Sequence, residues 1–265
     1  MPILCSVLKR MPEYRKSPMP LDLKEGAVFV TDAHYPRHKD DFLALLDYLI
    51  SSPPPQVFML GDMFEFLCPY TPYTVQANKQ AVEKIDTLSR KTELIYLEGN
   101  HDYLLKKLFP STKVYALNEQ PLILSYQDKT AAVMHGDKYA GGAYAAYTAL
   151  IRNPIFILFL RFLTIDINGR FIKKLYAKLS QKQICGHKEG FAAKKLSLVK
   201  NYPLCDVNAI IEGHNHIRIS EQAVNLQYEA LAAFACNKSF FKVEFKQSDL
   251  CFVETSLGAL KNEQA

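Results

Sequence analysis

The sequence predicts an α/β fold, in which strands and helices alternate along the chain. Short runs of β-branched and aliphatic residues, such as 27–30 and 57–60, alternate with segments whose apolar residues have helical spacing. Several of these runs are followed directly by Asp, Asn or His, as is typical of strands that end at a ligand site. The chain has 265 residues and a hydrophobic content of 49%, which is enough for a sizeable core and excludes disordered and fibrous classes.

The first part of the chain is predicted to contain three strands separated by two helices, in the order strand 26–31, helix 40–50, strand 56–60, helix 75–90 and strand 93–97. The first helix places Phe42, Leu45 and Leu49 on one face. It ends before Pro53, because proline lacks an N–H and disfavours the helical conformation in the residue that precedes it. This order of elements favours a layered α/β fold.

The second part is predicted to contain a hairpin, a long helical stretch and further strands, at residues 122–126 with 130–134, about 140–185, 207–211 and 240–253. The helical stretch interrupts the run of strands that end in polar residues. We therefore interpret it as an insertion into a single domain of residues 26–265, which follows an N-terminal arm of residues 1–25.

Five short polar segments follow apolar runs and together carry five of the seven histidines. These segments are Asp32-Ala33-His34, Gly61-Asp62, Gly99-Asn100-His101-Asp102, His135-Gly136-Asp137 and Gly213-His214-Asn215-His216. Side chains two residues apart on an extended backbone point to the same side, so each His or Asp pair of this spacing can reach one point. The candidate metal ligands are Asp32, His34, Asp62, Asn100, His135, His214 and His216.

This mixture of carboxylate, carboxamide and imidazole groups suits two divalent ions. We expect Mn²⁺, with Fe²⁺ or Zn²⁺ as alternatives. The segments contain no thiolate, which argues against a closed structural zinc site. Two such ions activate water and stabilise charge on phosphoryl oxygens, so the predicted reaction is hydrolysis of a phosphoester or a phosphoanhydride.

Each segment taken singly has a plainer interpretation. A lone Asp-x-His or Gly-Asp is more often a turn or a strand end than a ligand pair. Asn100 to Asp102 could cap a helix that begins at Tyr103, and His135 alone is more typical of a core histidine. The occurrence of all five segments in one chain favours the metal site.

The five segments resemble the motif set of the calcineurin-like metallophosphoesterase superfamily over about residues 27–216. The resemblance implies a four-layer αββα sandwich with the helical insertion as a lid. It implies that one ion is held by Asp32, His34, Asp62 and His216, and the other by Asp62, Asn100, His135 and His214. It further implies two catalytic residues: His101 near the phosphate, and Asp102, which would orient the ring of His101.

The segment Gly61-Asp62-Met63-Phe64-Glu65-Phe66 differs from the Gly-Asp-x-Val-Asp-Arg-Gly of protein phosphatases. It is similar to the form found in UDP-2,3-diacylglucosamine pyrophosphohydrolases of lipid A synthesis. That likeness implies cleavage of UDP-2,3-diacylglucosamine to UMP and 2,3-diacylglucosamine 1-phosphate. The chain departs from this group at His101, where the best-known members have Arg, and at Asn215, where they have Thr.

The charge of the chain is unevenly placed. Its net charge is +5, but residues 151–200 carry eleven Lys and Arg against two acids, so this region is +9 and the rest is −4. We expect anionic partners for this region: a nucleotide-linked lipid substrate and an anionic membrane surface, with no nucleic acid. The candidate substrate-binding residues are Arg152, Arg161, Arg170, Lys173 and Lys174.

The apolar run at 155–163 lies within this basic region and is too short to span a bilayer. It suits an interfacial helix or a groove for acyl chains, and a helix buried against the domain or a second subunit is equally compatible with its composition. The sequence does not predict an oligomeric state.

The six cysteines are scattered and include no CxxC pair, so we predict that they are reduced and that the compartment is the cytosol. Residues 1–26 lack the apolar region of a signal peptide, and no window approaches the roughly 18 apolar residues of a spanning helix. We therefore predict a cytoplasmic protein that associates peripherally with the inner membrane.

Two other hypotheses stay open. The first is a phosphodiesterase or nucleotidase that acts on a small soluble phosphoester; it predicts that activity survives charge reversal at Arg161 and Lys173. The second is a non-catalytic scaffold or nucleic-acid-binding protein on the same fold. The complete set of ligands argues against this second hypothesis.

Overall fold

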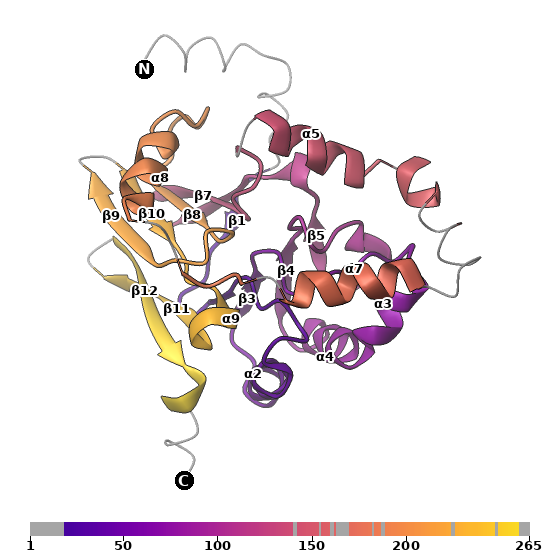
Figure 1. Ribbon diagram of the computed structural model, residues 1–265. Helices are drawn as coiled ribbons and strands as arrows, with labels where there is room; N and C mark the ends of the chain where they lie inside the picture. Colours follow the sequence, from indigo (N-terminus) through magenta and orange to yellow (C-terminus); the bar gives the residue numbers. More distant parts are fainter. Residues whose placement is uncertain are drawn as a thin grey trace.

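The computed structural model describes residues 19–139, 142–153, 155–159, 162, 170–181, 183–186, 189–223, 226–246 and 249–259. Within these residues the chain forms two six-stranded sheets with helices on the outer faces of both (Figure 1). This architecture is the αββα sandwich that the sequence predicts.

The first sheet has the strand order β12-β11-β2-β3-β4-β5. Its strands are β2 (Val28–Val30), β3 (Gln56–Met59), β4 (Glu93–Leu97), β5 (Lys113–Tyr115), β11 (Ser239–Lys246) and β12 (Asp249–Ser256). The strands from β2 to β5 run parallel, and β11 and β12 form an antiparallel hairpin that joins the sheet at β2. The strands predicted at 26–31, 56–60 and 93–97 are confirmed as β2, β3 and β4.

The second sheet has the order β1-β6-β7-β8-β10-β9. Its strands are β1 (Leu21–Asp22), β6 (Leu122–Tyr126), β7 (Lys129–Met134), β8 (Ala209–Glu212), β9 (Ile219–Ala223) and β10 (Leu226–Ala230). The predicted hairpin is confirmed as β6 and β7, and β8 runs parallel to both β7 and β10. Because β1 pairs with β6, the sheet already includes residues that we assigned to the N-terminal arm.

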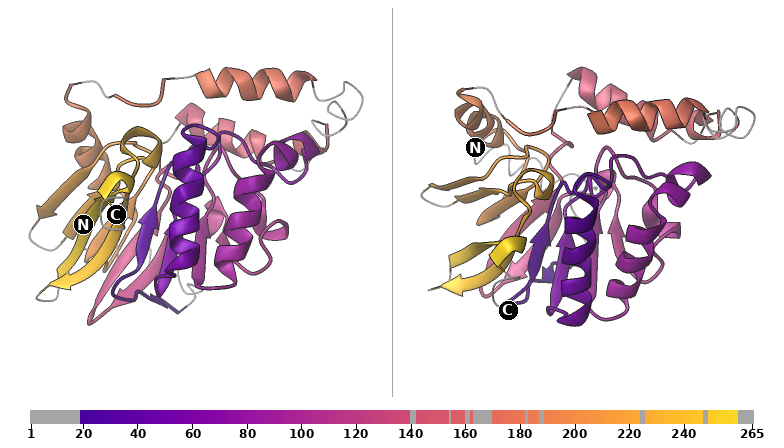
Figure 2. Two further views of the ribbon diagram at one scale, coloured as in Figure 1. Left: turned by 90° about the horizontal axis from the view of Figure 1, so that it is seen from below. Right: turned by 60° about the horizontal axis from the view of Figure 1, so that its bottom comes forward.

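The main core lies between the two sheets, where Phe29 and Phe58 stack at a ring distance of 4.3 Å and face Leu124, Val133 and Ile211. Helices α2 (Lys39–Ser51) and α4 (Lys79–Ser89) cover the outer face of the first sheet (Figure 2). Helix α8 (Phe191–Val199) packs on the outer face of the second sheet. The alternating side chains of the strands thus fill three apolar layers.

The single helix predicted at 75–90 is wrong, because the structure has two helices there, α3 (Pro72–Ala77) and α4. The break lies at Asn78, a buried residue whose amide donates to the carbonyls of Thr74 and Phe66, at 2.8 and 3.1 Å. An Asn side chain that hydrogen-bonds nearby backbone competes with the helix. The amide oxygen of Asn78 in turn accepts a hydrogen bond from Tyr176 at 2.9 Å.

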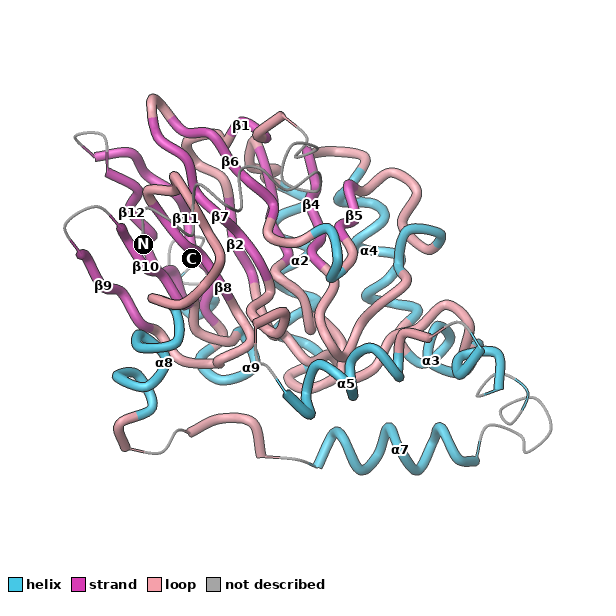
Figure 3. Tube along the Cα trace, turned by 90° about the horizontal axis from the view of Figure 1, so that it is seen from above, coloured by secondary structure: helices cyan, strands magenta, loops and turns pink. Residues whose placement is uncertain are grey.

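The predicted insertion contains α5 (Gly142–Ile151), a helical stretch over residues 155–159 and α7 (Arg170–Gln181). Helices α5 and α7 lie beyond one end of the strands (Figures 2 and 3). The insertion contacts the rest of the domain through an apolar cluster that includes Phe66, Tyr103, Ile157 and Tyr176. No helix among the described residues is long and apolar enough to cross a membrane.

Shorter elements complete the fold: the short helix α9 (Phe234–Asn237) and the 3₁₀ turns at residues 105–107 and 117–119. The prediction that the cysteines are reduced is wrong. Cys185 and Cys236 form a disulfide with Cα atoms 5.6 Å apart, and Cys205 is also disulfide-bonded. Cys68 and Cys251 are free thiols. The scattered spacing misled the prediction because the folded chain brings residue 185 next to α9.

Candidate active site

The five polar segments lie at the carboxyl ends of strands that are neighbours in space. They follow β2, β3 and β4 in the first sheet and β7 and β8 in the second. Parallel neighbours end at the same edge, so the loops of the two packed sheets meet there. The structure thereby brings together the side chains of Asp32, His34, Asp62, His135, His214 and His216.

The first cluster consists of Asp32, His34 and His216, whose potential ligand atoms all lie within 4.8 Å of one another. Nε2 of His216 is 3.1 Å from Oδ1 of Asp32 and 3.2 Å from Nε2 of His34. Asp32 and His34 are buried, and His216 is partly exposed. This cluster contains three of the four side chains expected around one ion.

The second cluster consists of Asp62, His135 and His214. Nε2 of His135 lies 3.4 Å from Oδ2 of Asp62 and 3.2 Å from Nδ1 of His214. The other carboxylate oxygen of Asp62 accepts a hydrogen bond from the backbone N–H of His101 at 2.8 Å. This contact holds the carboxylate in one orientation.

Backbone carbonyls determine which nitrogen of the histidine rings faces the clusters. Nδ1 of His135 donates to the carbonyl of Leu60 at 2.6 Å, and Nδ1 of His216 donates to that of Ile184 at 2.9 Å. Because a carbonyl can only accept, both Nδ1 atoms carry a proton, and Nε2 is the nitrogen that faces the clusters. Such outer contacts are typical of histidines that bind metal ions.

Two buried oxygens support the fit of this site to cations. Oδ1 of Asp32 and Oδ1 of Asn100 accept no hydrogen bond from the part of the chain that the structure describes. A buried polar atom without a partner is costly, and a cation would satisfy it. The ring nitrogens of His34 and His216, and those of His135 and His214, lie 3.2 Å apart. The donor set therefore fits divalent ions held by oxygen and imidazole nitrogen.

The pKa values of the two clusters differ from ring to ring. Burial lowers the pKa of His34 and that of His214 to about 3, so both rings are neutral at pH 7. Burial raises the pKa of Asp32, but the adjacent His216 outweighs this effect and lowers the value to about 2. Neutral imidazoles and an ionised carboxylate are the forms that bind metal ions.

The rings of His135 and His216 have raised pKa values. Burial lowers the pKa of each ring, but the adjacent carboxylates of Asp62 and Asp32 outweigh this effect and raise both values. Metal binding must therefore displace a proton from each of these rings.

The loops hold these side chains with an unusual backbone conformation. Positive φ angles occur at Asp32 (50°), His34 (48°), Asp62 (54°), His214 (62°) and His216 (57°). A residue with a Cβ avoids this region, at a cost of about 1 kcal/mol or more each, unless its surroundings impose it. The concentration of such residues at one edge of the sheets is typical of a functional site.

Two glycines let the loops approach one another. A Cβ at Gly99 would overlap the carboxylate of Asp62, and a Cβ at Gly213 would overlap the hydroxyl of Thr31, which donates to Asp32. Any larger residue at either position would therefore push a predicted ligand away from its cluster.

Asp102 does not orient the ring of His101 as we predicted. Its buried carboxylate accepts hydrogen bonds from the backbone N–H groups of Asp62 and Gly99, both at 3.0 Å, and from the hydroxyl of Tyr96 at 2.6 Å. Burial, with the nearby charge of Asp62, raises the pKa of Asp102 to about 7. Asp102 thus joins the loops after β3 and β4.

Glu65 is a site residue that we did not assign from the sequence. Its carbonyl accepts the Nδ1 proton of His101 at 2.7 Å, and its Oε2 lies 3.9 Å from Nδ1 of His34. Its Oε1 forms an ion pair with Arg37, which also donates to the carbonyl of Leu179 at 2.8 Å. The signal was present, because Glu65 belongs to the segment that resembles the lipid A enzymes.

The structure brings Arg152 to the site. This residue directly follows α5, and its Nη2 donates to the carbonyl of Gly99 at 2.6 Å. The guanidinium also lies 3.6 Å from the carboxylate of Asp137 and 5.7 Å from the ring centre of Tyr103. Arg152 therefore lies next to the loop that carries Asn100.

The other predicted substrate-binding residues are less directly placed. Lys173 lies over the ring of Tyr73 at 5.5 Å, and both Lys173 and Lys174 are exposed. Arg170 is the first residue of α7. Arg161 lies outside the described residues, so its predicted role is not addressed by the structure.

The fold and the clusters define a metal-dependent hydrolase with its site at the carboxyl edge of a two-sheet sandwich. The chain belongs to the calcineurin-like phosphoesterase family, whose profile matches residues 27–218.

Curated relatives are named UDP-2,3-diacylglucosamine hydrolase. The protein of that name from Coxiella burnetii is 24% identical over 155 residues, which are 56% of this chain and 62% of that protein, so the match spans less than two thirds of its length. The one from Pseudomonas putida is 23% identical over 198 residues, or 71% of this chain and 81% of that protein.

Solved structures that match the chain have lower identities. A dimetal phosphatase from Danio rerio matches with a TM-score of 0.44 and 10% identity, over 88% of this chain and 96% of that one. A conserved protein from Streptococcus pneumoniae, described as a predicted phosphoesterase, matches with a TM-score of 0.42 and 14% identity, over 89% of this chain and 91% of that one.

Proposed function

We propose that the protein is a two-metal pyrophosphohydrolase that cleaves UDP-2,3-diacylglucosamine to UMP and 2,3-diacylglucosamine 1-phosphate in lipid A synthesis. The observation that carries this proposal is the contact between the helical insertion and the site. Arg152 hydrogen-bonds the loop after β4, and the carbonyl of Ile184 accepts from His216, while apolar side chains of the insertion stay exposed. The names of the curated relatives support the same substrate.

Arg152 supports a phosphate-bearing substrate. Its side chain is only 14% exposed, and its Nε and Nη1 have no hydrogen-bond partner among the described residues. A guanidinium with unpartnered donors beside a metal centre is well suited to bind phosphoryl oxygens in a bidentate way. The contact with Gly99 directs the side chain toward the loop of Asn100.

The helical stretch at 155–159 supports a contact with acyl chains or a membrane surface. Ile157 is buried in the cluster with Phe66 and Tyr103, whereas Ile155 is 79% exposed and Leu158 and Phe159 are each 55% exposed. Grouped exposed apolar side chains are typical of a lipid or protein interface. The exposed Lys173 and Lys174 of the same insertion would attract the anionic head of a lipid.

In the proposed reaction one Mn²⁺ would be held by Asp32, His34, Asp62 and His216, and the other by Asp62, Asn100, His135 and His214. Bound ions would supply activation of water and stabilisation of charge on phosphoryl oxygens. His101 has its Nδ1 proton on the carbonyl of Glu65, which leaves Nε2 to exchange a proton with the leaving phosphate. Glu65 and Arg37 connect the ring of His101 to the insertion, because Arg37 pairs with Glu65 and donates to the carbonyl of Leu179 in α7.

We also propose a peripheral position on the anionic cytoplasmic face of the inner membrane. The disulfide between Cys185 and Cys236 removes the cysteine argument for the cytosol. The position therefore follows from a nucleotide-linked lipid substrate, together with the basic and apolar insertion.

The test is direct. Purified protein with Mn²⁺ would receive the UDP lipid in mixed micelles, and released UMP would be quantified, with an Asp62→Ala variant as the control for the metal centre. We expect UMP and the lipid 1-phosphate in equal amounts. Hydrolysis of bis(p-nitrophenyl) phosphate without any UMP release would favour the soluble phosphodiesterase, and no hydrolysis of either would favour the non-catalytic scaffold.

Charge reversal in the insertion separates the two enzymatic hypotheses. Lys173→Glu and Lys174→Glu should lower kcat/KM for the UDP lipid but not for bis(p-nitrophenyl) phosphate, because only the lipid presents its anionic head to the insertion. Lys246→Glu, on an exposed lysine of β11, is the matched control. Equal effects on both substrates would contradict lipid recognition by this surface.

A further inference from the structure

Glu212, the last residue of β8, is a fully buried carboxylate two residues before His214. Its Oε1 forms an ion pair with Nζ of Lys195 at 2.6 Å and accepts a hydrogen bond from the hydroxyl of Tyr228 at 2.6 Å. Its Oε2 accepts one from the hydroxyl of Tyr202 at 3.3 Å. A buried carboxylate is tolerated only when it is paired and hydrogen-bonded, and these donors meet that requirement.

A further donor to Glu212 belongs to the metal loop, which we define as residues 213–216. The side-chain amide of Asn215 donates to Oε1 of Glu212 and to the carbonyl of Gly213, both at 3.1 Å. Asn215 is buried and stands between His214 and His216. Its contact with Glu212 therefore fixes the loop from which both rings project.

The loop needs such support. His214 and His216 have left-handed backbone conformations, which the surroundings must impose. On one side the N–H of His214 donates to Oδ2 of Asp32 at 2.8 Å. On the other, Gly136 leaves so little room that a Cβ there would lie 3.2 Å from Cβ of His214 and 3.4 Å from Oε2 of Glu212. Glu212 thus lies next to the metal loop, on its buried side.

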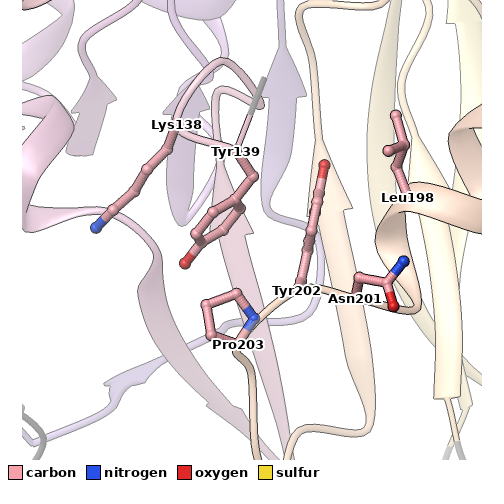
Figure 4. A pocket seen from close by; sticks show the side chains of 6 residues that line it. All are labelled: Lys138, Tyr139, Leu198, Asn201, Tyr202 and Pro203. Carbon is pink, nitrogen blue, oxygen red and sulfur yellow. The ribbon is translucent and has the colours of Figure 1, made fainter. Parts of the chain in front are cut away.

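Lys195 connects this carboxylate to α8, the helix that precedes β8. Its side chain is 7% exposed, and its Nζ also donates to the hydroxyl of Tyr202 at 2.8 Å. The ring of Tyr202 packs on that of Tyr139 at 4.5 Å and lines a surface pocket with Lys138 and Pro203 (Figure 4). One ammonium group therefore links a surface helix to the buried carboxylate behind the metal loop.

We propose that Glu212, held by Lys195 and Tyr228, is a positioning residue that acts through Asn215 to aim His214 and His216 at the metal ions. This inference rests on the two-metal part of the proposed function and is independent of the lipid substrate. Neither Glu212 nor Lys195 touches the reacting groups. Their effect is exerted on the orientation of the loop, and hence on metal affinity.

The experiment measures Mn²⁺ binding to the metal-free protein by calorimetry, with thermal unfolding of the same samples. Asn215→Ala and Glu212→Gln should each weaken Mn²⁺ binding about tenfold, the lower range for losing an outer partner of a metal ligand. The double variant should bind Mn²⁺ only slightly more weakly than either single variant, because both substitutions disrupt the same contact between Asn215 and Glu212. Wild-type affinity in both single variants, or fully additive losses, would overturn the inference.

A matched control separates positioning from general stability. Glu229 on β10 is similarly buried, and its partners among the described residues, Arg218, Ser220 and Gln227, lie outside the metal loop. Glu229→Gln should lower Tm yet retain wild-type Mn²⁺ affinity. Equal weakening of Mn²⁺ binding in Glu229→Gln and Glu212→Gln would show a merely structural role.

Lys195 provides a rescue test that does not depend on the loop variants. Lys195→Met leaves a buried carboxylate without its counter-charge and should unfold at a lower temperature. Adding Glu212→Gln should restore Tm without restoring Mn²⁺ affinity, and a double variant with wild-type affinity would contradict the inference. If the unaltered protein binds no Mn²⁺, the two-metal function and this inference both fail, whereas absent UMP release alone leaves the inference standing.

Discussion

The carboxyl edge of the sheets and the helical insertion differ in what their unpartnered groups would bind. At the edge, the buried oxygens of Asp32 and Asn100 that lack partners among the described residues suit cations. In the insertion, Arg152 keeps donors without partners among the described residues, and Leu158 and Phe159 are about half exposed. The difference indicates that the sheets hold the reaction centre, whereas the insertion is built to contact something further.

The same two regions also differ in net charge. Residues 151–200 carry a net charge of +9, and the rest of the chain carries −4. The clusters at the sheet edge contain Asp32 and Asp62, whose charges would be balanced by divalent cations. The basic region instead suits the phosphate groups of a substrate or a membrane.

The largest expected effect is loss of the reaction centre itself. Asp62→Ala removes a carboxylate from the second cluster and should lower kcat by more than about 100-fold, the upper range for losing an outer-shell partner. Turnover would be measured with Mn²⁺ on the UDP lipid. Asp128→Ala, in the exposed turn between β6 and β7, is the matched control, and full turnover by Asp62→Ala would contradict the two-metal mechanism.

Substitution of Arg152 tests the contact between the insertion and the loop after β4. Arg152→Ala should lower kcat/KM about 10- to 100-fold, because a hydrogen bond to a charged group contributes about 1.5–3 kcal/mol. Arg152→Lys should recover little, since lysine lacks the planar fork that reaches both the Gly99 carbonyl and a phosphate. Unchanged kcat/KM in Arg152→Ala, with the exposed Arg90→Ala as reference, would place the residue outside substrate recognition.

The exposed apolar side chains test the insertion alone. Leu158→Ser with Phe159→Ser should raise KM for the UDP lipid about tenfold and weaken binding to anionic vesicles, since each fully buried side chain of this kind contributes about 1.5–3 kcal/mol. Hydrolysis of bis(p-nitrophenyl) phosphate should not change. Val253→Ser, at an exposed apolar position on β12, is the control. If this variant loses as much vesicle binding as the variant with both substitutions in the insertion, the insertion is not the lipid-binding surface.

The smallest effect concerns charges within the first sheet. Burial raises the pKa of Glu93, but hydrogen bonds from Lys113, Gln56 and Lys24 outweigh it and lower the value from 4.5 to about 2. Because the folded pKa is depressed, the stabilisation is present above about pH 4.5 and is lost as the pH falls toward 2. Glu93→Gln should therefore lower Tm at pH 7 by about 2–4 °C for each kcal/mol lost, and by less near pH 2.

Thermal unfolding across this pH range measures the effect, with the exposed Glu25→Gln as the control. If Glu93→Gln lowers Tm by the same amount at pH 7 and at pH 2, the charge of Glu93 does not stabilise the sheet, and its effect comes from packing.

Several parts of the site follow from the sequence because they depend on short segments. Each apolar run with its polar ending predicts one strand and the residues that follow it, and β2, β3, β4 and the hairpin β6–β7 are confirmed. The gathering of Asp32, His34, Asp62, His135, His214 and His216 follows from the rule that parallel strands end at one edge. The left-handed backbone of Asp32, His34, Asp62, His214 and His216 did not follow, because none of them is glycine.

By itself the sequence determined the class of fold, the loops that carry the reaction and the family, since hydrophobic periodicity and motif order are local properties. The tertiary structure decided which partners each side chain finds. It placed Asp102 on the backbone of the loop after β3, paired Cys185 with Cys236, broke the helix at Asn78 and set Lys195 against Glu212. Most of these contacts join residues that are distant in the chain, so only the packing of complete elements brings them together.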